Sequence, residues 1–162
     1  MEIQRASGED WSQVWPFFHA IVVAGETYAY PPHLSADDAR ALWMETPPGL
    51  TVVAVDGDLV LGSAKMGPNR PGRGSHVATA SFRVSPAARG QGVGRLLGRY
   101  AVTWARAGGY RGMQFNAVVE TNTVAVRLWE SLGFESLCVV PEAFDSRKHG
   151  LVGLHEMYQS FT

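Results

Sequence analysis

Cysteine is almost absent from the sequence, and the histidines are scattered. Cys138 is the only cysteine among 162 residues. An internal disulfide is therefore excluded, and the composition fits a reducing cytoplasm. The histidines are His19, His33, His76, His149 and His155. They show none of the spacings at which metal ligands recur, and with one cysteine a zinc site is not credible. We expect no metal site.

Excess charge and long hydrophobic runs are also missing. The Lys and Arg residues number 14 and the Asp and Glu residues 15, which leaves a net charge of −1. A basic footprint for nucleic acid is thus absent, while a hydrophobic content of 46% argues against disorder. The longest apolar run near the start, Ala20–Ala24, is far shorter than the roughly 20 residues of a membrane span. No basic region precedes it as in a signal peptide. The sequence predicts a cytoplasmic protein without nucleic-acid or membrane partners.

What the sequence does contain is an ordered series of strand and helix patterns. The predicted strands are Glu2–Arg5, Leu50–Val55, Leu59–Met66, His76–Val84, Met113–Val119, Phe134–Val140 and Leu151–Ser160. The predicted helices run from Asp10 to Gly25, from Ser35 to about Glu45, from Val93 to Gly108, and over Asn122–Leu132. Tight turns favour antiparallel neighbours, and long helical connections allow parallel ones. The order predicts one α/β (α+β) domain over residues 1–162, a mixed sheet of about seven strands with helices on both faces.

Several local expectations accompany this order. Asp10 and Ser35 are expected to cap the first two helices, because short polar side chains accept first-turn N–H groups. Pro16 is expected to delay or bend the first helix. Pro141–Gly150 is predicted to be a polar loop, and Cys138 to lie in a core strand. The buried face of the third helix is expected to comprise Val93, Leu96, Leu97, Tyr100, Ala101 and Trp104.

The most informative segment is Val84–Arg95, which reads as a strand end, a glycine-rich loop and a helix start. Gly90, Gly92 and Gly94 occupy every second position. Glycine allows backbone angles that turn successive N–H groups to one side, and the following helix N-terminus adds free amides and a positive dipole. A phosphate-bearing ligand is therefore predicted. Two better-known phosphate loops do not match, because Arg95 follows Gly94 where the Walker type needs Lys, and the glycine spacing differs from the dinucleotide fingerprint.

The segment resembles the Arg/Gln-x-x-Gly-x-Gly/Ala loop of the GNAT superfamily of N-acetyltransferases, with Arg89, Gly92 and Gly94 at the defining positions. Residues Asn122–Phe134 are similar to the superfamily's second signature, Asn-x-x-Ala-x-x-Leu-Tyr-x-x-x-Gly-Phe, except that Trp129 replaces the tyrosine. The predicted order of elements also matches the GNAT fold. A looser resemblance links the chain to the branch that contains fungal N-acetyltransferases of proline analogues.

The resemblance implies acetyl-CoA as cosubstrate. It assigns the pyrophosphate to the main-chain amides of Arg89, Gly90, Gln91, Gly92, Val93, Gly94 and Arg95. It assigns the pantetheine arm to backbone groups near Phe82 and Val84, whose side chains we expect to belong to the strand core. The Val84 N–H is implied as a donor to the oxyanion.

The resemblance implies that the tyrosine of the second signature protonates the leaving thiolate. The indole N–H of Trp129 is a donor but not a usable acid, so this role is empty, moved elsewhere or taken by water. Trp129 is still expected beside the cofactor. Asn122 has two alternatives, a hydrogen bond to the thiolate or a helix N-cap. Asn116 interrupts an apolar strand, so its amide must find hydrogen-bond partners. Those partners are either the substrate or other groups of the protein.

The general base is left open between a carboxylate and a water relay. Glu120 follows the strand beside the acceptor side, and Glu26 lies in the loop that would cover the acceptor pocket. Thr27, Tyr28 and Tyr30 in the same loop are expected to line that pocket. Water is an equal alternative, since an amine needs only partial deprotonation.

The predicted function is transfer of acetyl from acetyl-CoA to the amine of a small molecule, such as an amino acid, an imino acid or a related amine, by direct attack. An acyl-enzyme on Cys138 is not expected, because no base neighbours it in the sequence. Two alternatives remain open: a catalytically silent acyl-CoA-binding module, suggested by the missing tyrosine, and a protein N-acetyltransferase. The sequence allows a homodimer.

Overall fold

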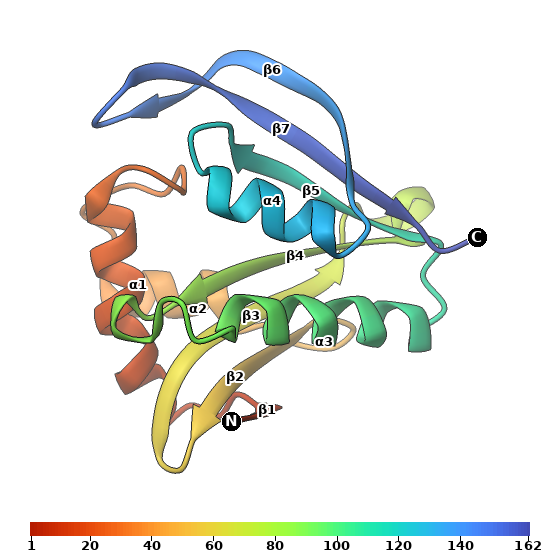
Figure 1. Cartoon of the computed structure of the whole chain (residues 1–162). Helices are drawn as coiled ribbons and strands as arrows, with labels where there is room; N and C mark the ends of the chain where they lie inside the picture. The colour runs from red at the N-terminus through yellow and green to blue at the C-terminus, as the bar shows by residue number, and fades with distance from the viewer.

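A computed structural model describes all residues, 1–162, and contains a single seven-stranded sheet (Figure 1). Its strands lie in the order β1-β2-β3-β4-β5-β7-β6. They are β1 (Glu2–Arg5), β2 (Leu50–Asp56), β3 (Leu59–Pro68), β4 (Val77–Val84), β5 (Gly112–Val119), β6 (Glu135–Ser146) and β7 (Gly150–Ser160). The helices are α1 (Trp11–Ala24), α2 (Ala36–Trp43), α3 (Val93–Ala107) and α4 (Thr123–Ser131). The predicted mixed α/β fold is confirmed.

Two antiparallel halves of the sheet meet at a single parallel pair. Strands β1 to β4 form one antiparallel half, and β5, β7 and β6 form the other. Between the halves, β4 and β5 pair only at Val77 with Gly112 and at Ala78 with Met113. Beyond these two pairs the strands diverge, as Figure 1 shows. The sheet therefore opens toward the carboxyl ends of β4 and β5.

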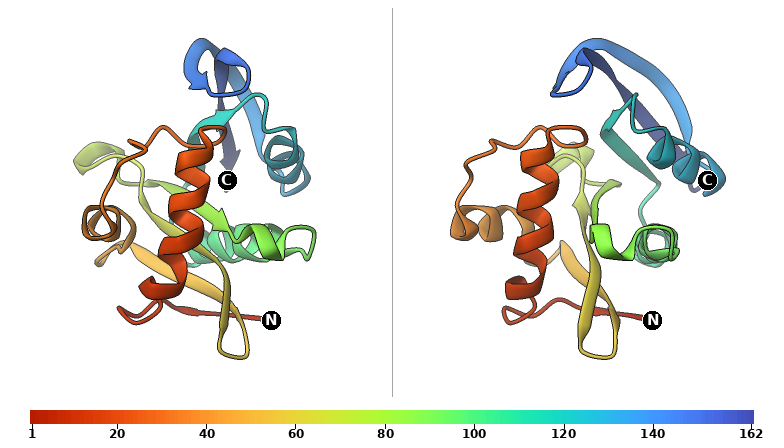
Figure 2. Two further views of the ribbon diagram at one scale, coloured as in Figure 1. Left: turned by 90° about the vertical axis from the view of Figure 1, so that its left-hand side faces the viewer. Right: turned by 60° about the vertical axis from the view of Figure 1, so that its left-hand side comes forward.

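The helices cover both faces of the first half of the sheet, with α1 on one side and α3 on the other (Figure 2). Val53 and Val55 of β2 pack into a cluster of ten buried residues with α1 and α2. Val52 and Ala54 pack into a cluster of 19 that includes residues of α3 and α4. This division follows from the period of two in a strand, which sends successive side chains to opposite faces.

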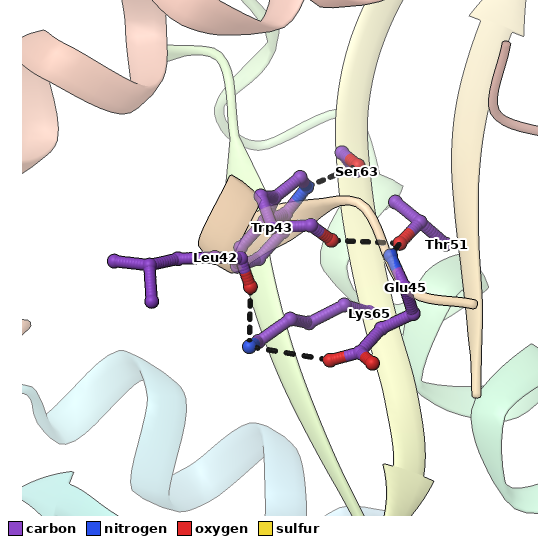
Figure 3. A network of polar contacts seen from close by, with 6 residues as sticks. All are labelled: Leu42, Trp43, Glu45, Thr51, Ser63 and Lys65. Atoms are coloured by element: carbon purple, nitrogen blue, oxygen red, sulfur yellow. Dashed lines mark hydrogen bonds and ion pairs between the residues drawn. The ribbon is translucent and has the colours of Figure 1, made fainter. Parts of the chain in front are cut away.

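The end of α2 is fastened to β2 and β3 by a polar network (Figure 3). The indole Nε1 of Trp43 donates to Ser63 Oγ at 2.8 Å, and Thr51 Oγ1 donates to the Trp43 carbonyl at 2.7 Å. Lys65 Nζ donates to the Leu42 carbonyl at 2.8 Å and pairs with Glu45 at 3.4 Å. Trp43 is fully buried in the core, and its indole N–H and its carbonyl are both hydrogen-bonded.

The caps of the first two helices differ from each other. Ser35 Oγ accepts the Asp38 N–H, which confirms the expected cap of α2. Asp10 does not cap α1 with its side chain, because its carboxylate accepts the N–H and the hydroxyl of Ser7 instead. Pro16 neither delays nor interrupts α1. Because proline has no N–H, the carbonyl of Ser12 lacks its helical hydrogen bond. Pro16 and Ser12 are both exposed, so water can bind this carbonyl instead.

Three local predictions were wrong, the one on the face of α3 only in part. The buried face of α3 comprises Val93, Leu97, Gly98, Ala101 and Ala105. Leu96, Tyr100 and Trp104 are only partly buried, because α4 packs against α3 at Gly98 and turns the contact face toward it. Strand β6 extends through Ser146 and absorbs most of the predicted loop. Cys138 is exposed, since β6 is the edge of the sheet and most of its residues face solvent.

Candidate active site

A cavity of about 260 Å³ occupies the gap between β4 and β5. Its walls come from the two strands, from α4 and from the loop after α1. Of the residues singled out in the sequence, the cavity brings together Thr27, Tyr28, Tyr30, Phe82, Asn116, Asn122 and Trp129. Residues more than a hundred positions apart thus meet at the point where the sheet opens.

An aromatic stack on α4 and its neighbours forms the wall of the cavity toward α3. The ring centroid of Trp129 lies 4.6 Å from that of Phe82 and 4.9 Å from that of Phe115. Phe115 in turn stacks on Phe134 at 4.3 Å. Trp129 is buried, and its six-membered ring lies against Gly98 of α3. The tryptophan that replaces the expected tyrosine is therefore a packing element of this wall as well as part of the cavity lining.

The glycine loop presents a set of free backbone amides. Gly90 and Gly92 have φ angles of 76° and 82°, and a Cβ at either position would meet nothing within 4 Å. The α3 ladder begins with the Leu96 N–H on the Gly92 carbonyl, so the amides of Val93, Gly94 and Arg95 have no intrahelical acceptor. No side chain caps this helix. Open space and free donors are what a bound phosphate requires.

The other residues of the glycine loop differ in how exposed their side chains are. The side chains of Arg89, Gln91 and Arg95 are exposed, whereas Val93 is buried and offers only its amide. Gly94 faces α4, because a Cβ there would lie 3.2 Å from Leu128 Cδ2. Its lack of a side chain therefore also serves the packing of α3 on α4.

Strand β4 turns backbone groups that do not pair with β3 toward the gap. Ser85 N–H donates to the Leu61 carbonyl at 2.9 Å, and Val84 stands opposite Gly62. In an antiparallel ladder this makes Val84 and Gly62 a non-hydrogen-bonded pair, so the Val84 N–H points away from β3. Phe82 shares that direction, and its carbonyl accepts the hydroxyl of Tyr28. As expected, the Phe82 side chain is buried in the core, and Val84 packs against the same core.

The two asparagines of the cavity are both fixed by hydrogen bonds. Asn116 Nδ2 donates to Asn69 Oδ1 at 2.7 Å, and Asn116 Oδ1 accepts from Gln114 Nε2 at 3.0 Å. Asn122 Oδ1 accepts the Ala125 N–H at 3.3 Å, which makes Asn122 the N-cap of α4. Its Nδ2 has no protein partner.

Neither of the carboxylates singled out in the sequence lines the cavity. Glu120 Oε1 accepts the Gly153 N–H at 2.6 Å and so joins β5 to β7. Glu26 accepts the Ser146 hydroxyl at 2.6 Å and the Lys148 N–H at 2.7 Å. These hydrogen bonds, the one from Ser146 foremost, hold the pKa of Glu26 below its ordinary value. Both groups are engaged in structural contacts.

One functional candidate was missed in the sequence. Arg83, next to Phe82 on β4, is 1% exposed and lies under the ring of Tyr28. A single arginine in a strand pattern gave no signal in the sequence. Only the fold places around it aromatic residues from α1, from the loop after α1 and from α2.

Three further features bear on function. A second hollow, about 640 Å³, lies between the end of α1 and the β6–β7 hairpin, and Tyr28 and Tyr30 line both it and the cavity. None of the helices combines the length and the apolar character that crossing a membrane requires. The structure holds no group of three or more His, Cys, Asp or Glu side chains placed to bind a metal ion.

Comparison with known proteins agrees with this geometry. The chain is 35% identical over 103 residues to the N-acetyltransferase aca1 of Schizosaccharomyces pombe, and the match covers 63% of the chain. The chain spans about half the length of that yeast relative, 49%. A GCN5-related N-acetyltransferase from Kribbella flavida superposes with a TM-score of 0.96 at 56% identity, over 99% of this chain and 97% of the other.

A phosphinothricin acetyltransferase from Sinorhizobium meliloti, solved in complex with AcCoA, shares the fold with a TM-score of 0.86 at 22% identity, over 98% of this chain and 87% of the other. The model of the acetyltransferase (GNAT) family matches residues 14–134. With three quarters of the chain matched, the sheet opened between β4 and β5 and the glycine loop at the start of α3, the chain belongs to the acetyltransferase (GNAT) family.

Proposed function

We propose that the protein is an acetyl-CoA-dependent N-acetyltransferase that acetylates the amine of a small molecule, such as an amino acid or imino acid. The observation that carries this proposal is the cavity at the opening of the sheet, which is lined in part by α4, the helix against which Gly94 at the start of α3 also packs. A volume of about 260 Å³ suits a small acceptor better than a folded protein surface.

The residues present fit acetyl-CoA. The two left-handed glycines and the free amides of Val93–Arg95 would hold the pyrophosphate, and the backbone of Phe82 and Val84 would lie along the pantetheine. The exposed Arg89 and Arg95 add positive charge near the phosphates. When bound, acetyl-CoA supplies an acetyl group activated as a thioester. The complex of the Sinorhizobium meliloti protein with AcCoA, in the same fold, supports acetyl-CoA as the cosubstrate.

Backbone and asparagine groups perform the remaining chemistry in this proposal. The Val84 N–H points into the gap and donates to the oxygen on which negative charge develops. The Asn122 Nδ2, left free because Oδ1 caps α4, donates to the departing sulfur. A thiol with a pKa near the ~8.5 of free cysteine can leave as a hydrogen-bonded thiolate without an acid.

Asn116 orients the acceptor amine. Its amide cannot rotate, because Asn69 and Gln114 hold both ends, and the second lone pair of Oδ1 is available to an N–H from the cavity. Water accepts the amine proton, since Glu120 and Glu26 are engaged elsewhere. The homodimer stays a prediction.

The test is a panel of amino acids, imino acids and other small amines incubated with acetyl-CoA. N-acetylated products are detected by mass spectrometry, which avoids thiol reagents that would label exposed Cys138. Acetyl-CoA-dependent product from at least one small amine is expected. Tight binding of acetyl-CoA in calorimetry with no product from any amine would favour the silent binding module. Product only from peptide N-termini would favour a protein N-acetyltransferase.

A further inference from the structure

Arg83 is a buried cation inside a box of aromatic rings. Its guanidinium carbon lies 3.1 Å from the ring centroid of Tyr28 and 4.8 Å from that of Phe18. Trp43 and Tyr30 complete the box, with centroids at 4.9 Å and 5.4 Å. The side chain is 1% exposed. Few arginines are this deeply enclosed without an acidic partner.

No acidic partner is present. The ion pairs of the chain involve Asp56 and Glu45, and neither includes Arg83. Its Nη1 donates to the Phe82 carbonyl at 3.2 Å, while Nε and Nη2 are buried without any hydrogen-bond partner. Burial lowers the pKa of Arg83 from its ordinary value, against the opposing effect of the neighbouring tyrosines. Cation–π contacts offset only part of the cost of burying a charge, so the site lacks an anion.

The two unpaired nitrogens form one edge of the guanidinium. Nε–H and one Nη2–H point in parallel, and this edge matches the two oxygens of a carboxylate. A carboxylate accepting both N–H groups would satisfy the unpaired donors and neutralise the buried charge together.

Arg83 lies on the same face of β4 as two residues that line the cavity, Thr79 and Ser81. The period of two along β4 places Thr79, Ser81 and Arg83 on the face toward α1 and α2, opposite the face of Phe82 and α3. Thr79 and Ser81 line the cavity, and their hydroxyls have no side-chain partner. Tyr28 and Tyr30 also line the cavity, so one layer of tyrosine rings separates the guanidinium from it.

We propose that the acceptor carries a carboxylate close to its amine, and that Arg83 binds this carboxylate through Nε and Nη2 when the Tyr28 ring swings aside. This inference rests on the proposed acetyltransferase function and adds the substrate class: amino or imino acids rather than neutral amines. Arg83 is then the residue that determines specificity, while Asn116 orients the amine.

The experiment compares acceptors that differ only in the anion, L-proline with L-prolinamide and L-methionine with L-methioninamide. Binding to the full chain in the presence of coenzyme A is measured by calorimetry, and turnover by mass spectrometry of the acetylated product. Each acid is expected to bind roughly tenfold or more tighter than its amide, the effect of hydrogen bonds to a charged group. R83M is expected to remove this preference and to raise KM for the acid while KM for acetyl-CoA stays unchanged.

Arg5→Met is the matched control, because Arg5 is exposed on β1 at the opposite edge of the first half of the sheet. It should keep the preference for the acid. R83M should melt no lower than the wild type, since replacing an uncompensated buried ion by an apolar side chain is often neutral or stabilising. If R83M does not fold, Arg83→Lys carries the test: it keeps the charge without the two-nitrogen edge and should lose most of the preference.

Equal binding of acids and amides, no binding of any acid, or a preference that survives in R83M and Arg83→Lys would overturn the carboxylate site even if acetylation proceeds. A lower melting temperature of R83M with an unchanged preference would likewise make Arg83 a purely structural residue. Absence of product from every acceptor, with a preference that depends on Arg83, would instead contradict the acetyltransferase proposal and leave the carboxylate site standing.

Discussion

Single residues of the glycine loop act through backbone conformation rather than through side-chain chemistry. Gly92 adopts a left-handed conformation at the N-cap of α3, next to the amides that would hold the pyrophosphate. Its surroundings are empty, so steric contact with the protein does not demand glycine there. What demands it is the φ angle of 82°. An alanine would strain that conformation and move the amides.

We therefore expect Gly92→Ala to weaken acetyl-CoA binding. The left-handed conformation costs an L-residue about 1–2 kcal/mol, which corresponds to a roughly fivefold to thirtyfold rise in KM for acetyl-CoA. Gly57→Ala is the matched control, because Gly57 also has a positive φ, at 60°, and empty surroundings, but lies in the β2–β3 hairpin. The control should lose similar stability and keep its KM. Equal KM values for the two variants would exclude a role of the loop conformation in binding.

Trp129 is the opposite case: it stands where the family signature has a tyrosine, but its packing alone accounts for the side chain. If a tyrosine here restored a missing general acid, kcat would rise by about 100-fold or more. We expect Trp129→Tyr to change kcat by less than about threefold, because in our proposal Asn122 already stabilises the leaving sulfur. Trp129→Phe separates the loss of ring volume from the gain of a hydroxyl. A large gain in kcat for the tyrosine variant alone would contradict this view.

At the scale of elements, the contact between α3 and α4 sets the wall of the cavity. A Cβ on Gly98 would lie 2.8 Å from both Leu132 Cδ1 and Trp129 Cζ3. The glycine lets α4 approach closely and seats the indole of Trp129 against Phe82. A side chain at position 98 would push α4 outward.

Gly98→Ala tests this contact. Alanine gains about 1 kcal/mol of helix propensity, but overpacking costs about 1–3 kcal/mol, so the free energy of unfolding should fall rather than rise. Thr103→Ala, at an exposed position of the same helix, gains propensity without a clash and should be slightly stabilised. The measurement is urea unfolding of both variants. Stabilisation of Gly98→Ala would mean that the two helices are not in tight contact.

At the scale of the whole molecule, the strands of the two halves of the sheet pair at only two positions of β4 and β5, and side-chain packing and the loop after α1 supply the remaining contacts. Glu26 in that loop binds Ser146 and Lys148 of the β6–β7 hairpin, and the Gly25 carbonyl accepts the Arg147 N–H at 3.0 Å. Figure 2 shows the hairpin tip curling toward the end of α1. These contacts close the molecule across the opening that contains the cavity.

This closure should depend on pH. The hydrogen bonds to Glu26 depress its pKa in the folded state below the ordinary value of 4.5. Its contribution to stability is therefore fully present above pH 4.5 and is lost as the pH falls through the lower, folded pKa. Glu26→Gln should accordingly be less stable than the wild type at neutral pH. The difference in stability between the two proteins should shrink as the pH falls below 4.5. Thermal melting of both proteins across this range checks it; a difference that does not change with pH would refute the assignment.

The sequence by itself determined the order of elements, the glycine loop and the family. These features are local: Ser35 caps α2 through a bond three residues away, and Gly90 and Gly92 take left-handed angles that only glycine adopts freely. Thr27, Tyr28, Tyr30, Asn116 and Asn122 could be named in advance because a family pattern fixes where they fall relative to these elements. Their presence in one cavity agrees with that pattern.

Only the tertiary structure decided what each polar group binds. Glu120 and Glu26 are occupied by backbone and hydroxyl donors from β7 and the β6–β7 hairpin, and Cys138 is exposed because both faces of β6 are largely uncovered. Arg83 is the clearest example, since its aromatic box comes from α1, α2 and the loop after α1. Such partners are distant in sequence and meet through long-range packing, which leaves no local pattern of spacing to read.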